Sequence, residues 1–399
     1  MQATPSSRPI KTGTSKTGIS KRLIFLIASA VSASAANLYY NQPILPLIGQ
    51  DLALSDALLG AIPAATQIGY ALALLFISPL GDRFPRRNVI AFLSVLLTLT
   101  ALMASFAHTG YVLVAACLLI GLSANITQQL IPFAASLSSP DTKAQVMGTV
   151  MTGLTVGILV SRTLSGVISE HFGWRAVFIM SATIALLFGV LLYRFLPNNK
   201  PTNSMSYFQL IISMGSLVRQ HKVLRESAFI GALWFAAFNA LWATLALHVS
   251  EAPFHYSTQQ IGLFGILAMS GIIGAKLSGR WVPKFGSRRI LMVSMSLIIL
   301  GFGIAALFTD SLLGLCIAII LIDLGVFSGQ VANQVRIFSI DPAAQSRINA
   351  VYMLFYYSGA AIGSAIGVNI ISAMGWSAIC IFCALITGIG LLYHGIKRA

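Results

Sequence analysis

The chain has 399 residues, of which 57% are hydrophobic and only 9% are charged. A water-soluble protein could not bury this much apolar surface, so the composition indicates an integral membrane protein. The net charge of +15 does not indicate nucleic-acid binding, because the basic residues fall in short loops between apolar segments.

The chain begins with a polar segment, residues 1–20, that lacks the apolar stretch of a signal peptide and is expected to be a disordered cytoplasmic tail. Twelve apolar segments follow, each long enough for the roughly 20 residues that a membrane-spanning helix needs. They are expected at 22–48, 57–80, 88–107, 111–137, 144–169, 174–196, 226–250, 259–282, 288–308, 311–337, 345–372 and 375–396. We therefore expect a six-helix bundle over 21–196, a cytoplasmic linker over 197–225 and a second six-helix bundle over 226–396.

The two halves look like copies of one another. A charged loop between the second and third segments, residues 78–90, has a counterpart at residues 279–290, and Gly173-Trp174 recurs as Gly375-Trp376. A parallel repeat of this kind predicts two pseudo-symmetric bundles that enclose a cavity near the middle of the bilayer.

The basic residues predict the orientation. If the N-terminus is cytoplasmic, all of the 25 Lys and Arg except Arg162, Arg175 and Lys276 lie on the cytoplasmic side. This bias matches the positive-inside rule. We expect both termini in the cytoplasm and the protein in the inner (plasma) membrane of a bacterium.

Stripes of small residues at four-residue spacing occur in corresponding segments of the two halves. Such stripes let helix backbones approach closely, and we expect the second segment to pack on the eleventh and the fifth on the eighth. The residues expected in this packing between the halves are Gly153, Gly157, Gly271, Gly359 and Gly363.

The charged loop resembles the signature loop of the major facilitator superfamily, through Leu80, Asp82, Arg83, Arg86 and Arg87, although Ser78 and Pro85 replace its two glycines. The resemblance covers residues 21–396. It implies an all-α fold of twelve transmembrane helices in two bundles, a monomer that moves a small molecule, and a cytoplasmic gate that includes Asp82, Arg83 and Arg86. For the arginines, membrane orientation alone is the other interpretation.

Residues 153–175 are similar to the antiporter motif of the twelve-helix drug:proton antiporters, with Arg162 at the position where that motif usually has proline. This similarity implies a proton-coupled antiporter as the nearest branch.

Two charged residues fall inside apolar segments, Asp323 near the middle of the tenth and Arg162 in the fifth. A charged group in the bilayer costs at least about 2.5–3.5 kcal/mol, so such residues usually serve a function. We expect the two to pair in one conformation and to separate in another, with Asp323 then taking up the proton. The alternatives are a permanent structural ion pair, or an Asp323 that faces a wet cavity.

Amide and aromatic side chains share helical faces and must face protein or water rather than lipid. The residues expected to line the substrate cavity are Asn37, Tyr40, Asn41, Asn125, Gln128, Gln129, Trp234, Phe238, Asn239, Gln330 and Gln334. With little charge, such a cavity suits a neutral or weakly cationic organic molecule.

The sequence therefore predicts a proton-coupled transporter that works by alternating access and exports small amphipathic compounds or drugs. The alternative is a carrier of the same fold for a metabolite such as a sugar or nucleoside. No phosphate loop and no metal-ligand pattern is recognisable, and Cys380 and Cys383 stand without a second pair. We expect neither enzyme activity nor a cofactor or metal.

Overall fold

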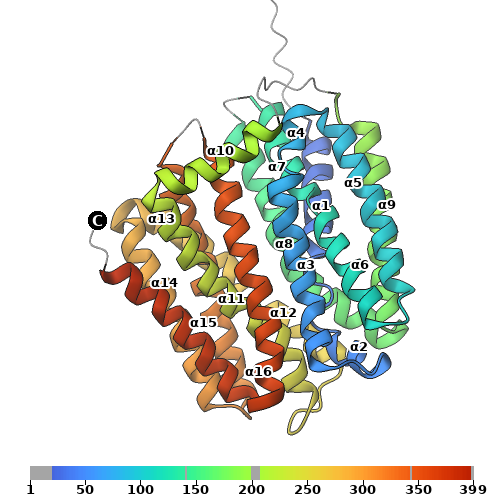
Figure 1. The fold of residues 1–399 in the computed structure, drawn as a ribbon, viewed down its shortest axis with the longest axis vertical. Helices are drawn as coiled ribbons and strands as arrows, with labels where there is room; N and C mark the ends of the chain where they lie inside the picture. Colours follow the sequence, from blue (N-terminus) through green and yellow to red (C-terminus); the bar gives the residue numbers. More distant parts are fainter. Residues whose placement is uncertain (1–19, 140–141, 199–206, 342–343, 397–399) are drawn as a thin grey trace, which may run out of the picture.

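The computed structural model of the chain describes residues 20–139, 142–198, 207–341 and 344–396, and these residues form helices joined by turns, without a strand (Figure 1). The expected tail lies outside the described residues except for Ser20, whose hydroxyl caps the first helix. Long helices are the natural outcome for such a chain, because a helix satisfies its own backbone hydrogen bonds in lipid.

The first half of the chain contains nine helices within the described ranges. They are α1 (Lys21–Ala36), α2 (Leu45–Asp51), α3 (Asp56–Phe76), α4 (Leu80–Arg83), α5 (Arg86–Ser105), α6 (Gly110–Ser123), α7 (Ile126–Leu137), α8 (Lys143–Phe172) and α9 (Trp174–Phe195). Buried apolar side chains of these helices form a core cluster, and a smaller, separate cluster contains Leu38, Tyr39, Tyr70, Leu74 and Ala124.

The second half follows, and its buried apolar side chains form a second cluster. Its helices are α10 (Tyr207–Gln220), α11 (Lys222–Ser250), α12 (Thr258–Leu267), α13 (Ser270–Phe285), α14 (Ser287–Leu307), α15 (Leu312–Phe338) and α16 (Gln345–Ile396), the last of which is two helices joined at Gly375.

Eleven helices of the described chain are long and apolar enough to cross a membrane, when α6 with α7 and α12 with α13 are each taken as one. They coincide with the expected segments from the second to the twelfth. The first expected segment is not one helix, because α1 ends at Ala36 and the chain turns before α2 begins at Leu45. Pro43 lies within this break and disfavours helical backbone in the residue before it.

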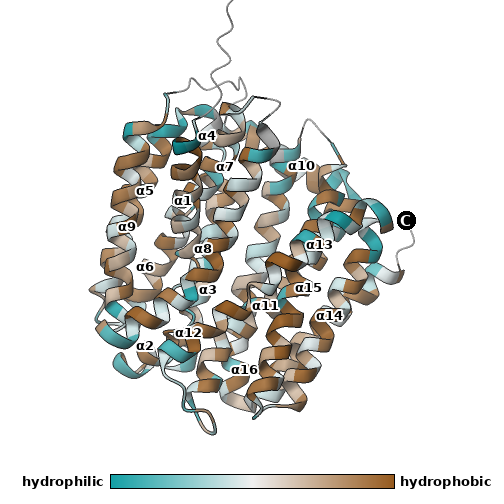
Figure 2. Cartoon of the chain, turned by 180° about the vertical axis from the view of Figure 1, so that it is seen from behind, coloured by the Kyte–Doolittle hydropathy of each residue, from teal (hydrophilic) through white to brown (hydrophobic). Residues whose placement is uncertain are grey.

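Charged and polar residues gather at the two ends of the molecule, while apolar residues cover the sides of the helices (Figure 2). We call these ends the α10 end and the α2 end, after the short helices that lie there (Figure 1). The expected linker contains the helix α10, and α11 begins inside it at Lys222. The Tyr207 hydroxyl of α10 donates a hydrogen bond to the carbonyl of Phe76 on α3, over 2.7 Å.

Three turns depend on a glycine with positive φ: Gly173, Gly286 and Gly375 have φ of 79°, 81° and 81°. Side chains rarely tolerate this conformation. Gly173 and Gly375 precede the two Trp residues of the repeat, Trp174 and Trp376, so the repeated dipeptide marks the same turn in each half.

The expected pairing of the halves is confirmed, since α3 packs on α16 and α8 packs on α12. At these contacts a Cβ on Gly60 would lie 3.1 Å from the carbonyl of Ala365, and one on Gly166 would lie 2.4 Å from that of Thr258.

The prediction was wrong for the five glycines that were expected in this packing. Gly153 and Gly157 pack on α1 at Ala28 and Ser32, and Gly359 and Gly363 pack on α11 at Ala232 and Ala236. Gly271 faces the ring of Phe327 on α15. Each therefore serves packing within its own half, because a stripe of small residues permits close approach without specifying the neighbouring helix.

Candidate functional site

Arg162 lies on α8 in the interior of the molecule, with only 1% of its surface exposed. Three aromatic rings surround its guanidinium: the Cζ atom lies 3.9 Å from the ring centroid of Trp242, 4.9 Å from that of Tyr39 and 5.8 Å from that of Phe238. Trp242 and Phe238 belong to α11, while Tyr39 lies in the turn after α1. The rings therefore come from both halves, and their faces attract the cation.

Arg162 donates hydrogen bonds through only some of its guanidinium nitrogens. Its Nε donates to Oε1 of Gln42 over 3.0 Å, and its Nη1 donates to the carbonyl of Ile158 over 3.4 Å. The Nη2 atom is buried without a partner. Gln42 in turn donates to Asn239 of α11 over 3.5 Å, so the amides join the turn after α1 to the second half.

Asp323 lies on α15 and is completely buried, yet neither of its carboxyl oxygens has a hydrogen-bond partner. Phe327, one turn along α15 from Asp323, has its ring centroid 6.2 Å from that of Phe238, which is one of the rings around Arg162. The expected direct pair with Arg162 is absent from the ion pairs of the described residues.

Among the predicted cavity residues, Phe238 and Asn239 belong to this centre, and Trp234 is buried one turn away with its Nε1 unpartnered. Asn41 donates to the hydroxyl of Thr66 over 3.0 Å. Gln330 accepts a hydrogen bond from the Tyr352 hydroxyl over 2.8 Å, and Gln334 is half-buried.

Three predicted cavity residues on the fourth span instead form hydrogen bonds with partners in the first half. Asn125 exchanges hydrogen bonds with the Ser78 hydroxyl at 3.2 Å, and Gln128 donates to the Tyr70 hydroxyl at 3.0 Å. Gln129 donates to the carbonyls of Ile77 and Ser78, both at 3.3 Å. These contacts hold the loop before α4, while the amide oxygen of Gln129 is buried without a hydrogen-bond partner.

The contacts of Asn37 and Tyr40 lie elsewhere. Asn37 bonds to Ser181 of α9, and Tyr40 lies beside a groove of about 440 Å³ between α1, α8 and α9. The assumed shared helical face does not exist, since the helix ends before these residues. Tyr39 and Gln42 reach the centre in their place, and sequence periodicity gave no sign of either.

The predicted gate is described in part. The side chain of Asp82 lies outside the described part of the structure, and Arg83 is exposed. Arg86 donates to the carbonyl of Gln129 over 3.3 Å, which joins α5 to α7.

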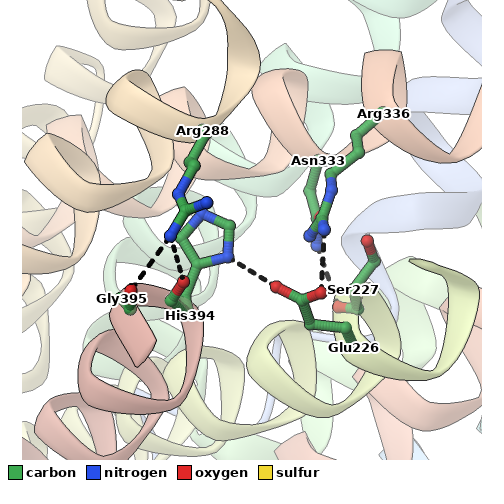
Figure 3. Close-up of polar contacts among 7 residues, drawn as sticks. All are labelled: Glu226, Ser227, Arg288, Asn333, Arg336, His394 and Gly395. Atoms are coloured by element: carbon green, nitrogen blue, oxygen red, sulfur yellow. Dashed lines mark hydrogen bonds and ion pairs between the residues drawn. The ribbon is translucent and has the colours of Figure 1, made fainter. Parts of the chain in front are cut away.

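Another polar network lies at the α10 end of the second half (Figure 3). Glu226 of α11 bonds to Arg336 of α15 and to His394 of α16, and Arg288 of α14 donates to the carbonyls of His394 and Gly395. This network could not be predicted from the sequence, because its members are far apart along the chain.

The described residues contain no group of three His, Cys, Asp or Glu side chains that could hold a metal ion. The central site is therefore an aromatic and amide-lined enclosure with one cation and one unpartnered carboxyl group.

Comparisons with known proteins agree on the class. The sequence profile of the Major Facilitator Superfamily matches residues 26–341. A transporter named YgaY from Escherichia coli O157:H7 is 36% identical over 95% of this chain and 97% of its own length. The probable transporter SCO4007 from Streptomyces coelicolor is 30% identical over 95% of this chain and 88% of its own.

Among solved structures, a bacterial homologue of the human lysosomal transporter Spinster, in an inward-facing and occupied conformation, superposes with a TM-score of 0.79. The two chains share 15% identity over 94% of this chain and 96% of the other. At that identity the likeness concerns the fold.

Proposed function

Because the chain belongs to the Major Facilitator Superfamily and is a membrane transporter rather than an enzyme, we propose that it exports small amphipathic organic molecules in exchange for protons. In this proposal the protein is a bacterial inner-membrane carrier that works as a monomer with two bundles.

The observation that carries the proposal is the state of Asp323. Its carboxyl group is fully buried on a membrane-spanning helix and has no hydrogen-bond partner. A charged carboxylate is costly in such surroundings. A group of this kind serves as a proton carrier if it is neutral in one conformation and meets water or a cation in the other.

Alternating access is supported by where the halves touch. At the α2 end, the hydroxyl of Thr258 on α12 donates to the carboxylate of Glu170 on α8 over 2.7 Å, and Thr163 donates to the carbonyl of Gly262 over 2.9 Å. The eighth span consists of α12 and α13. It packs on α8 through α12, which is the part of the span near the α2 end, rather than through α13. We take this as the state that is closed at the α2 end.

The orientation follows from charge. In the described residues the basic side chains of loops and helix ends gather at the α10 end, with Arg175 as the exception at the α2 end. By the positive-inside rule the α10 end is cytoplasmic, and in this proposal closure at the opposite end is a feature of the inward-facing state. Asp82, Arg83 and Arg86 then lie where a cytoplasmic gate would close in the opposite state.

The proposal is tested by dye accumulation in an efflux-deficient host, with and without the protein and with and without a protonophore, followed by transport into proteoliposomes with an imposed pH gradient. We expect lower dye accumulation in cells with the protein and loss of this effect with the protonophore. Asp323→Asn should abolish gradient-driven transport, whereas Asp310→Asn, an exposed acid at the α2 end, should leave it unchanged.

Gradient-driven transport that survives in Asp323→Asn would remove the proton role from this residue. A metabolite carrier is the second candidate, and the buried amides of Gln42 and Asn239 favour it because they suit a polar substrate such as a sugar or nucleoside. Uptake of such a compound without any effect on dye accumulation would favour that candidate.

A further inference from the structure

The rings around Arg162 form a cation-binding cage. Trp242, Tyr39 and Phe238 place their rings within 3.9–5.8 Å of the guanidinium carbon, and all three side chains are at least nine-tenths buried. Ring faces arranged in this way are a common means of binding organic cations such as quaternary ammonium groups. The occupant here is a side chain of the protein itself.

Arg162 is weakly held as an occupant. It is buried without a carboxylate within ion-pair distance among the described residues, and its Nη2 atom has no partner. Asp323, a buried acid on α15, lacks hydrogen-bond partners for both oxygens. Phe327, one turn along α15 from Asp323, lies 6.2 Å between ring centroids from Phe238 of the cage. A cation and a carboxyl group that both lack partners have a second possible arrangement, in which they pair directly.

We propose that the cage of Tyr39, Phe238 and Trp242 binds the cationic head group of an amphipathic substrate, and that Arg162 occupies this cage as an internal substitute when no substrate is present. This inference rests on the proposed function and assigns its substrate class. The substrate would be an organic cation, such as a quaternary ammonium ion or a protonated amine, with an aromatic or aliphatic body.

The exchange balances in charge. With Asp323 protonated, Arg162 stays in the cage and the site carries one positive charge. When the carboxylic acid releases its proton to water, Arg162 pairs with the carboxylate and leaves the cage to a monovalent cation, so the site again carries one positive charge. Substrate entry and proton release are thus coupled, as an antiporter requires.

Few other titratable groups face this exchange. From the turn after α1, Tyr39 is one of the cage rings, and Tyr70 of α3 and Tyr357 of α16 meet edge-to-face with ring centroids 4.5 Å apart. Tyr356 of α16 stacks on Phe235 of α11 at 3.6 Å. Phenols ionise near pH 10, so Asp323 is the group around Arg162 that can change charge between pH 5 and pH 8.

The test measures binding of radiolabelled benzyltrimethylammonium to the full chain in lipid nanodiscs, with benzenesulfonate as a probe of opposite charge. Trp242→Leu should weaken binding of the cation by about thirtyfold, the effect of losing a desolvated cation–π contact. Trp242→Phe should retain part of it. Trp281→Leu, an exposed residue outside the cage, serves as the matched control and should bind like the wild type.

Arg162→Met gives the decisive result. If Arg162 competes with the substrate, its removal should tighten cation binding at pH 6 by about tenfold or more, because the competent state is then always populated. Weaker cation binding in this variant, or benzenesulfonate binding that requires Arg162, would overturn the inference and indicate an anion site. Unchanged cation binding in Trp242→Leu or Trp242→Phe would also overturn it.

The two proposals fail separately. Proton-driven transport that persists while the cage variants bind the cation normally would contradict the cage and leave the exporter. Cage-dependent cation binding without any response of transport to a pH gradient would contradict proton coupling and leave the cage.

Discussion

The Nδ1 atom of His394, near the end of α16, lies 2.7 Å from one carboxylate oxygen of Glu226, near the start of α11. The other oxygen of Glu226 lies 2.8 Å from Nη2 of Arg336 on α15. Figure 3 shows how this single acid joins three helices of the second half at their α10 ends. Because 7% of the Glu226 side chain and 2% of the His394 side chain are exposed, the contact is shielded from solvent.

Glu226→Gln should destabilise the protein strongly, since removing one partner of a buried ion pair leaves the other charge uncompensated. The expected loss is about 3–5 kcal/mol in the free energy of unfolding, which thermal unfolding in detergent would detect as a lower Tm. Glu251→Gln, in an exposed position at the α2 end, is the matched control. Equal Tm values for the two variants would show that the network is not important for stability.

Gly166→Ala should disturb closure at the α2 end, because its Cβ would lie 2.4 Å from the backbone carbonyl of Thr258. The halves would have to separate there. Disulfide formation between cysteines introduced by Glu170→Cys and Thr258→Cys would measure the separation, and we expect a lower yield with Gly166→Ala. Gly148→Ala on the same helix, where a Cβ meets nothing within 4 Å, should leave the yield unchanged.

Gly375→Ala should cost about 1–3 kcal/mol, since a φ of 81° with a ψ of −178° is a conformation that residues other than glycine rarely adopt. In contrast, Gly388→Ala lies on the same helix in open space and should be neutral or stabilising by up to about 1 kcal/mol. Thermal unfolding of both variants tests the difference. A Gly375→Ala protein as stable as the wild type would contradict the need for glycine in the turn.

Asp51 should give the α2 end an acid-sensitive contact. Hydrogen bonds from Arg175, at 2.5 Å, and from Trp174, at 3.1 Å, lower the pKa of Asp51 below its usual 3.8. A lowered pKa in the folded state means that the contact stabilises the protein above pH 3.8 and is lost as the pH falls through the folded value.

Asp51→Asn should therefore have a lower Tm than the wild type at pH 7, and this difference should shrink below pH 3.8. The exposed carboxylate makes the effect small. A Tm difference that stays constant from pH 7 to pH 2.5 would rule out this linkage.

The helices themselves were predictable from the sequence, as the spans from the second to the twelfth show. Their positions follow from apolar length alone, because lipid forces the backbone to satisfy its own hydrogen bonds. The pairing of α3 with α16 and of α8 with α12 followed from the repeat, and the charged residues Asp323 and Arg162 were visible because ions are rare in apolar segments.

The contacts inside the bundle were not predictable in the same way. The first span breaks after Ala36, so Tyr39 and Gln42 reach Arg162 where Asn37 and Tyr40 were expected. The stripes of Gly153 and Gly359 turned out to face α1 and α11, since a small residue permits an approach but does not choose the partner.

By itself, then, the sequence determined the membrane location, the number of apolar segments and the rarity of charge within them, all of which are properties of single segments in lipid. Only the tertiary structure decided that Arg162 sits among three rings rather than on Asp323, and that Glu226, Arg336 and His394 share one site. These contacts join residues separated by up to 168 positions, and their geometry depends on how helices rotate against one another, which no local pattern encodes.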